Sequence, residues 1–247
     1  MEFLIAHVSD LHIGSTEFIP DKLETCIDEV NSLSPDLVAL TGDLTNSGFE
    51  KEYKRAKEYV EKFKAKTIVI PGNHDTRSTG YTYYEEYFGE GNQFTDLGNV
   101  TVISVDSTLP DNDEGYLGRE RVRWLSENLR KVEEKDFRIV LVHHHLIPVP
   151  GTGMERNELI DAGDVLSTLV ANKVNLALCG HRHVPYTWKL ENLIVITSGT
   201  ACTGYVRARI PQAYFIISIK DKSVKITLKE VGGKETTIRN IEFNNLH

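Results

Sequence analysis

The sequence predicts an α/β fold that becomes rich in β-structure toward its C-terminal end. Short apolar runs of strand length recur through the first three quarters of the chain, and segments with helical spacing of apolar residues lie between most of them. After residue 186, apolar runs alternate with tight turns alone. The 247 residues, of which 40% are hydrophobic and 26% charged, can bury a sizeable core, and we expect a single domain over residues 1–247.

Six apolar runs, each ending in polar residues, predict buried strands. Because the apolar stretches are nearly continuous, we expect both faces of these strands to be covered. The runs span residues 3–10, 36–43, 67–75, 100–106, 138–145 and 175–183.

Four segments between these runs predict amphipathic helices. In the first, Leu23, Ile27 and Val30 share one helical face after Pro20, a residue that suits the first turn of a helix. The other three segments span residues 53–63, 122–132 and 165–170. Tyrosines at positions 81, 83, 84 and 87 offer either flat faces for stacking on a nucleobase or packing side chains of a further helix.

The composition excludes several classes of protein. A formal charge of −8 makes a nucleic-acid polymer a poor fit as partner, because no overall basic field would attract it. No apolar run approaches the roughly 20 residues needed to cross a bilayer, and the first residues lack the basic region of a signal peptide. Cys26, Cys179 and Cys202 form no CxxC pair, which is typical of core thiols in a reducing compartment. We therefore expect a soluble cytoplasmic protein that does not associate with membranes.

Polar side chains stand where the predicted strands end, and they are the main functional signal. A single histidine or Gly-Asp pair after a strand is usually part of a turn, but eight of the nine histidines lie in or near such ends, together with two aspartates and an asparagine. In open sheets covered by helices, groups beyond the carboxyl ends of the strands converge on one crevice. The residues concerned are Asp10, His12, Asp43, Asn73, His74, His143, His144, His145, His181 and His183.

The chemistry of these side chains predicts a metal site. Oxygen and imidazole donors without cysteine suit Mn, Fe, Zn, Co or Ni. The candidate ligands exceed what one ion needs, and an aspartate can bridge two ions about 3.5 to 4 Å apart, the spacing used for in-line displacement at phosphorus. The residues therefore predict a dinuclear phosphoesterase with two divalent or transition metal ions.

Five blocks in this order resemble the calcineurin-like metallophosphoesterases. They are SDLH (9–12), TGDLTNSG (41–48), PGNHD (71–75), VHHH (142–145) and CGHRH (179–183). The resemblance implies a four-layer αββα sandwich with two mixed β-sheets, the metals lying at one edge. Within that fold we expect residues 186–247 to complete the second sheet. Exposed edge strands pair readily, so a homodimer is one arrangement this segment allows.

Carried over position by position, the resemblance implies a role for each block. Asp10, His12 and His183 would hold one metal, Asn73, His143 and His181 the other, and Asp43 would bridge. His74 would act as an acid or electrostatic partner facing the leaving group. In the triple histidine, a shift of the ligand from His143 to His144 stays open, and His144 and His145 are alternatively rim or substrate residues.

The expected reaction is the attack of a metal-bound hydroxide on a phosphodiester. The chain is most similar to the branch with class III cyclic-nucleotide phosphodiesterases, which implies a small phosphoester substrate, with nucleotides as candidates. The alternatives are a phosphomonoesterase of the same fold, a nuclease, and a non-catalytic scaffold. Arg77 is either a phosphate contact or an ordinary surface arginine, and no substrate-binding residue is assigned.

Overall fold

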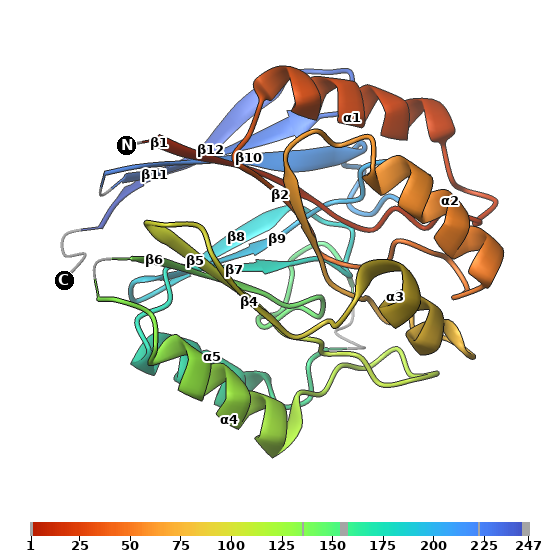
Figure 1. Cartoon of the computed structure of the whole chain (residues 1–247). Coiled ribbons are helices and arrows are strands. Elements are labelled where there is room, and N and C mark those ends of the chain that lie inside the picture. Colours follow the sequence, from red (N-terminus) through yellow and green to blue (C-terminus); the bar gives the residue numbers. More distant parts are fainter. Residues whose placement is uncertain (1, 135, 154–157, 222, 244–247) are drawn as a thin grey trace.

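The computed structural model describes residues 2–134, 136–153, 158–221 and 223–243, and in this part of the chain two six-stranded sheets lie face to face (Figure 1). The first sheet, in the order β12-β11-β10-β1-β2-β3, contains β1 (Glu2–Val8), β2 (Leu37–Leu40), β3 (Lys66–Val69), β10 (Ala213–Lys220), β11 (Ser223–Glu230) and β12 (Glu235–Glu242). The second, in the order β4-β5-β6-β7-β9-β8, contains β4 (Gln93–Asp96), β5 (Val100–Ser104), β6 (Phe137–Leu141), β7 (Leu176–Cys179), β8 (Tyr186–Leu190) and β9 (Leu193–Thr197).

Helices cover the outer faces of both sheets (Figure 1). On the first sheet lie α1 (Pro20–Leu33), α2 (Glu50–Val60) and α3 (Gly80–Phe88), and on the second lie α4 (Gly118–Leu129) and α5 (Ala162–Ala171). The predicted four-layer αββα sandwich is therefore confirmed. None of the helices in the described residues is long and apolar enough to cross a membrane.

The alternation of side chains along each strand explains why the apolar runs are continuous. In β2, Val38 and Leu40 pack into the core beneath α1 and α2, whereas Leu37 and Ala39 point into the core between the sheets. Successive side chains of a strand point to opposite faces, so a strand that is covered on both faces needs apolar residues throughout.

The segment after residue 186 corrects one expectation. Only β8 and β9 join the second sheet, whereas β10, β11 and β12 extend the first. β10 pairs antiparallel with β1, with Ile217 opposite Ile5, because β2 occupies the other edge of β1 and leaves this edge free. The segment thus contributes to both sheets.

Two strands were not assigned from the sequence, and one helix was only one of two alternatives for the clustered tyrosines. β4 has four residues that alternate between half-buried and exposed, and β12 is exposed along nearly its whole length, so neither has an apolar run. α3 contains the clustered tyrosines. Tyr84 is buried in the core beneath the helices, and the ring of Tyr87 stacks on that of Tyr53, so this group packs the helix. Tyr81, by contrast, is 46% exposed.

The direction of the strands determines where the functional loops lie. β1, β2 and β3 run parallel to one another in the first sheet, as do β5, β6, β7 and β9 in the second. The carboxyl ends of parallel strands meet at one edge of their sheet. The loops that follow β1, β2, β3, β6 and β7 carry the polar residues singled out above.

Candidate metal centre

The loops after five strands bring together seven side chains, which we call the ligand cluster. They are Asp10, His12, Asp43, Asn73, His143, His181 and His183. Two groups of potential ligand atoms can be distinguished, each with its atoms within 4.8 Å of one another: Asp10, His12, Asp43 and His183 form the first, and Asp43, His143 and His181 the second. Asp43 belongs to both groups.

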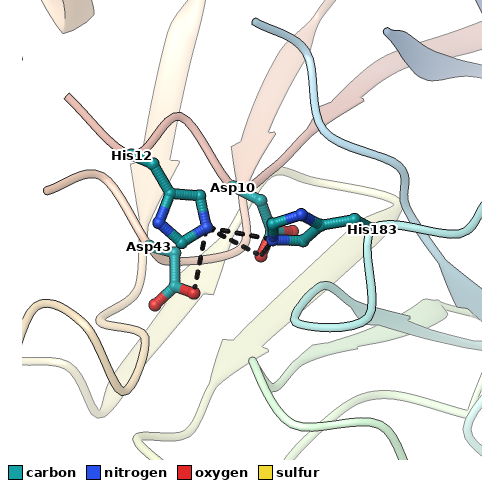
Figure 2. Close-up of side chains that lie close together, drawn as sticks. All are labelled: Asp10, His12, Asp43 and His183. Atoms are coloured by element: carbon teal, nitrogen blue, oxygen red, sulfur yellow. Dashed lines mark hydrogen bonds and ion pairs between the residues drawn. The ribbon is translucent and has the colours of Figure 1, made fainter. Parts of the chain in front are cut away.

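The atoms of the first group converge on one point (Figure 2). His12 Nε2 lies 2.9 Å from His183 Nε2 and 3.5 Å from Asp43 Oδ2, and His183 Nε2 lies 3.3 Å from Asp10 Oδ1. Ligands that surround one ion at about 2.0 to 2.2 Å are about 3 to 3.5 Å from their neighbours. These three spacings suit a single ion.

The second group has the same spacing. Asn73 Oδ1 lies 3.1 Å from His143 Nε2 and 3.0 Å from His181 Nδ1, and His143 Nε2 lies 3.5 Å from Asp43 Oδ1. Asp43 therefore presents Oδ2 to the first group and Oδ1 to the second. The two groups adjoin across a single carboxylate.

Backbone geometry in the cluster is unusual. Five of its residues have positive φ, between 47° and 74°: Asp10, His12, Asp43, His181 and His183. This left-handed region is uncommon for residues other than glycine, although Asp and His tolerate it better than most, and each instance costs free energy that the surroundings must offset. Hydrogen bonds between loops stabilise this backbone conformation. The N–H of Asp10 donates to the carbonyl of Gly42, and the N–H of His12 donates to the carbonyl of Asp43.

Glycine is required at two positions beside the cluster. A Cβ on Gly72 would lie 2.2 Å from Asp43 Oδ1, and one on Gly180 would lie 2.1 Å from Ser9 Oγ and 2.7 Å from Asp10 Oδ2. These contacts are far below van der Waals distance. Both glycines therefore let the loop backbone approach the carboxylates of the ligand cluster.

Two histidines of the cluster have a defined tautomer. A carbonyl oxygen only accepts, so the 2.6 Å contact of His143 Nδ1 with the Thr41 carbonyl and the 2.7 Å contact of His183 Nδ1 with the Tyr205 carbonyl place a hydrogen on each Nδ1. A neutral ring then directs the lone pair of Nε2 into the cluster. Such a hydrogen bond on the second nitrogen is usual for histidines that bind metals.

Burial and charge set the protonation of these groups. Burial lowers the pKa of His12 and His181 well below the ordinary value, and neighbouring histidines add to the effect. For the buried pair of Asp10 and His183, desolvation opposes both charges, but their mutual attraction outweighs it and lowers the pKa of Asp10 while raising that of His183. His12 and His181 thus favour the neutral form that binds metals.

The donor set passes a direct test of fit to metal ions. His143 Nε2 and Asn73 Oδ1 are both acceptors when the imidazole is neutral, and they face each other at 3.1 Å. Two lone pairs at this distance repel unless a proton or a cation lies between them. With nitrogen and oxygen donors only, the cluster suits divalent or transition metal ions.

His74 lies beside the cluster and lines a cavity of about 320 Å³ together with His12, Asp43, Asn73, Asp113, His181, Arg182, His183, Tyr205, Val206 and Arg207. Its Nδ1–H donates to the Asn46 carbonyl at 2.7 Å, and its backbone N–H donates to Asp43 Oδ1 at 3.0 Å. The ring is therefore oriented, with Nε2 left for a group in the cavity.

The triple histidine divides into one residue of the cluster and two others. His143 joins the second group, whereas His144 Nδ1 lies 2.7 Å from Ser107 Oγ and His144 Nε2 donates to the Asp113 carbonyl at 3.2 Å. His145 stacks parallel to His181, with ring centroids 5.7 Å apart. His144 supports the loop that contains Ser107 and Asp113.

Three residues near the cluster carried no role in the sequence analysis. Asp75, the last residue of the PGNHD block, is fully buried and accepts hydrogen bonds from the backbone of Leu44, Thr45 and Gly72. Burial raises the pKa of Asp75 to about 6, and the Asp43 carboxylate acts in the same direction. The other two, Tyr205 and Asp113, lie in loops without a motif, so no sequence signal marked them.

Asp113 connects Arg77 to the cluster. Its Oδ1 accepts hydrogen bonds from Arg77 Nη2 at 2.8 Å and from Asn73 Nδ2 at 2.9 Å. Partial burial alone would raise the pKa of Asp113, but the hydrogen bond and charge of Arg77 outweigh it and hold the pKa below its ordinary value. Arg77 is thus engaged in an ion pair.

Comparison with known proteins links the chain to phosphoesterases. A family model described as calcineurin-like phosphoesterase matches residues 3–185. A probable glycerophosphodiester phosphodiesterase, GpdQ, of Arcobacter nitrofigilis is 32% identical over 213 residues, which cover 80% of this chain and 78% of that protein. The 3',5'-cyclic adenosine monophosphate phosphodiesterase CpdA of Escherichia coli is 28% identical over 168 residues, 66% of this chain and 60% of that protein.

Solved structures share the fold at low sequence identity. The purple acid phosphatase PPD1 of yellow lupin superposes with a TM-score of 0.75 at 15% identity, over 96% of this chain and 53% of that protein, so this chain spans about half of it. A dimetal phosphatase of Danio rerio superposes with a TM-score of 0.71 at 12% identity, over 96% of this chain and 98% of that protein. At such identities the likeness concerns the fold alone.

Proposed function

The chain belongs to the calcineurin-like phosphoesterase family, a family of hydrolases, and from that premise we propose that it hydrolyses phosphodiester bonds of small molecules with two metal ions held by the ligand cluster. One observation carries the proposal: two groups of ligand atoms share Asp43 beside an open cavity. Two-ion sites with one bridging carboxylate suit displacement at phosphorus.

In the proposed site, Asp10, His12 and His183 would hold one ion, Asn73, His143 and His181 would hold the other, and Asp43, which contacts both groups, would be shared between them. When bound, the ions would supply Lewis acidity toward phosphoryl oxygens and lower the pKa of a water molecule. The positive charge of two divalent ions would exceed the negative charge of the Asp10 and Asp43 carboxylates, so the occupied cluster would be cationic. A cationic cluster attracts the anionic phosphodiester.

His74 is proposed to act on the leaving group. Because Nδ1 is tied to the Asn46 carbonyl, a protonated His74 can present only the hydrogen on Nε2 to a ligand in the cavity. There it would donate to the leaving oxygen or to a phosphoryl oxygen. The hydrogen bond to Asn46 keeps the ring from turning away.

The substrate proposed is a small diester, with 3',5'-cyclic nucleotides as the first candidate. Several similar proteins are named as cyclic nucleotide phosphodiesterases, and another as a probable glycerophosphodiester phosphodiesterase. The cavity of about 320 Å³ suits a small ligand, and Tyr205 offers an aromatic face at its wall. The net charge of −8 does not favour a nucleic-acid polymer.

We also propose a cytoplasmic location. Cys26, Cys179 and Cys202 are buried free thiols, as is usual in a reducing compartment. The oxygen and imidazole donors of the cluster suit Mn, Fe, Zn, Co and Ni alike.

The proposal is tested by stripping the protein with a chelator, adding back Mn²⁺ and measuring release of p-nitrophenol from bis-p-nitrophenyl phosphate and from p-nitrophenyl phosphate. Asn73→Ala serves as the control that removes one ligand atom. Cyclic AMP and a glycerophosphodiester are then compared as natural candidates.

We expect Mn²⁺-dependent hydrolysis of the diester and its loss in Asn73→Ala. A preference for the monoester would identify a phosphomonoesterase of the same fold. A protein that binds no ions and hydrolyses neither ester would contradict the proposal and favour a non-catalytic scaffold.

A further inference from the structure

The amide of Asn73 has two different ends, and only one of them can bind a cation. Its oxygen is an acceptor, whereas its NH₂ group is a donor and would repel a metal ion. The ends have almost the same shape, so packing alone does not select between them. The cluster needs the oxygen, and Asn73 Oδ1 indeed faces His143 and His181.

Asp113 determines which end of the Asn73 amide faces the ligand cluster. A carboxylate can only accept, and Asp113 Oδ1 lies 2.9 Å from Asn73 Nδ2, so the NH₂ end is drawn away from the cluster. Rotating the amide by 180° would place its oxygen against the carboxylate and its NH₂ group against His143 and His181. The contact between the amide oxygen and the Asp113 carboxylate would then be unfavourable, because both groups only accept. The NH₂ group could donate to the neutral His143 Nε2, but it could not bind a cation.

Arg77 and His144 hold Asp113 in place. Arg77 Nη2 donates to Asp113 Oδ1 at 2.8 Å. The positive charge of Arg77 also offsets the negative charge of Asp113, which would otherwise add to the charges of Asp10 and Asp43. His144 donates to the Asp113 carbonyl, and Gly115 packs so closely on the His144 ring that a Cβ there would lie 2.4 Å from Cγ. The His144 ring therefore contacts the loop at both Asp113 and Gly115.

We propose that Asp113, held by Arg77, is a positioning residue. It turns the Asn73 oxygen toward the ion that Asn73 would share with His143 and His181. This inference rests on the proposed two-ion function. Asp113 and Arg77 belong to none of the five motif blocks. Their role is inferred from the tertiary contacts alone. Partners of this kind that orient a ligand typically contribute 10- to 100-fold to metal affinity.

The test is a titration of chelator-stripped protein with Mn²⁺ by isothermal calorimetry, with the number of bound ions checked by elemental analysis. Asp113→Ala removes the acceptor, and Asp113→Asn keeps an oxygen that can still accept from Asn73. Glu114→Ala is the matched control, because it removes an exposed carboxylate from the same loop that does not line the cavity of the cluster. Circular dichroism verifies that each variant is folded.

We expect Asp113→Ala to weaken one of two binding steps about 10- to 100-fold and leave the other nearly unchanged. Asp113→Asn should recover part of the loss, and Glu114→Ala should bind as the wild type does. Because the effect acts through Asn73, adding Asp113→Ala to Asn73→Ala should cause no further loss.

Two results would overturn the inference while leaving the proposed function intact: unchanged affinities in Asp113→Ala, or losses that add to those of Asn73→Ala. A wild-type protein that binds no Mn²⁺ would overturn both. The binding readout is independent of the substrate, so an inactive but metal-loaded protein still tests the role of Asp113.

Discussion

His74 differs from the histidines of the ligand cluster in what its ring nitrogens can reach. Nδ1 is taken by the Asn46 carbonyl, and the residue joins neither group of ligand atoms, although its ring lies edge-on to that of His12 with centroids 4.5 Å apart. A side chain that is oriented by the protein but not used as a ligand is available for proton transfer.

Replacement of His74 by alanine tests this role. We expect turnover of a diester to fall about 10²- to 10⁴-fold, the usual contribution of a positioned acid, while two ions remain bound. The measurements are steady-state kinetics and elemental analysis of the same sample. Loss of an ion in His74→Ala would show instead that the residue supports metal binding.

At the scale of the elements, the N-terminus of α4 is capped by Asp161, the residue directly before another helix. Leu117, which precedes α4, has no side chain able to accept a hydrogen bond, and the carboxylate of Asp161 accepts from the backbone N–H groups of Leu117 and Gly118 at 3.1 and 2.8 Å. Asp161 itself directly precedes α5. One carboxylate therefore satisfies donors of α4 and ties the two outer helices together.

Asp161→Ala should lower the free energy of unfolding by about 1 to 3 kcal/mol, because two backbone donors lose a charged acceptor. Urea denaturation followed by circular dichroism measures the change. Asp164→Ala, on the exposed first turn of α5, is the matched control, and we expect it to cost less than about 1 kcal/mol. Equal losses in the two variants would contradict the capping role.

At the scale of the whole molecule, His7 couples stability to pH. The ring is fully buried, stacks near Phe215 and contacts Thr41 Oγ1 at 2.9 Å. Burial lowers the pKa of His7 to about 3, only partly offset by the charge of Asp10. The folded protein therefore keeps His7 neutral, whereas the unfolded chain protonates it below about pH 6.5. The contribution of neutral His7 to the free energy of unfolding is fully present above pH 6.5 and is lost as the pH falls toward 3.

His7→Gln removes this titration and keeps a group that can hydrogen-bond to Thr41. Between pH 7 and pH 5 the wild type should lose about 2 kcal/mol of unfolding free energy relative to the variant, as follows from linkage. Denaturation of the metal-free proteins at both pH values, in the presence of chelator, measures the difference. A difference that does not change with pH would mean that His7 is not held neutral in the folded protein.

Much of the fold and of the site followed from local patterns. Each apolar run of a buried strand is a property of consecutive residues, and donors such as Asp10, His12 and His181 follow those runs directly, so their convergence at the strand ends could be inferred. The nature of the ligand atoms is likewise a property of the residue types. The sequence by itself therefore determined the α/β class, the resemblance to a family and the choice of the residues that now form the cluster.

Only the tertiary structure decided features that depend on pairing between distant segments. β10 joins the first sheet because β1, more than 200 residues earlier, has a free edge, and no local pattern records that partner. His143 rather than His144 enters the cluster because Thr41 holds its Nδ1, and Asp113 orients Asn73 across a loop without a motif. Hydrogen bonds and strand pairing are set by distances in space, and these become defined only when the whole chain has folded.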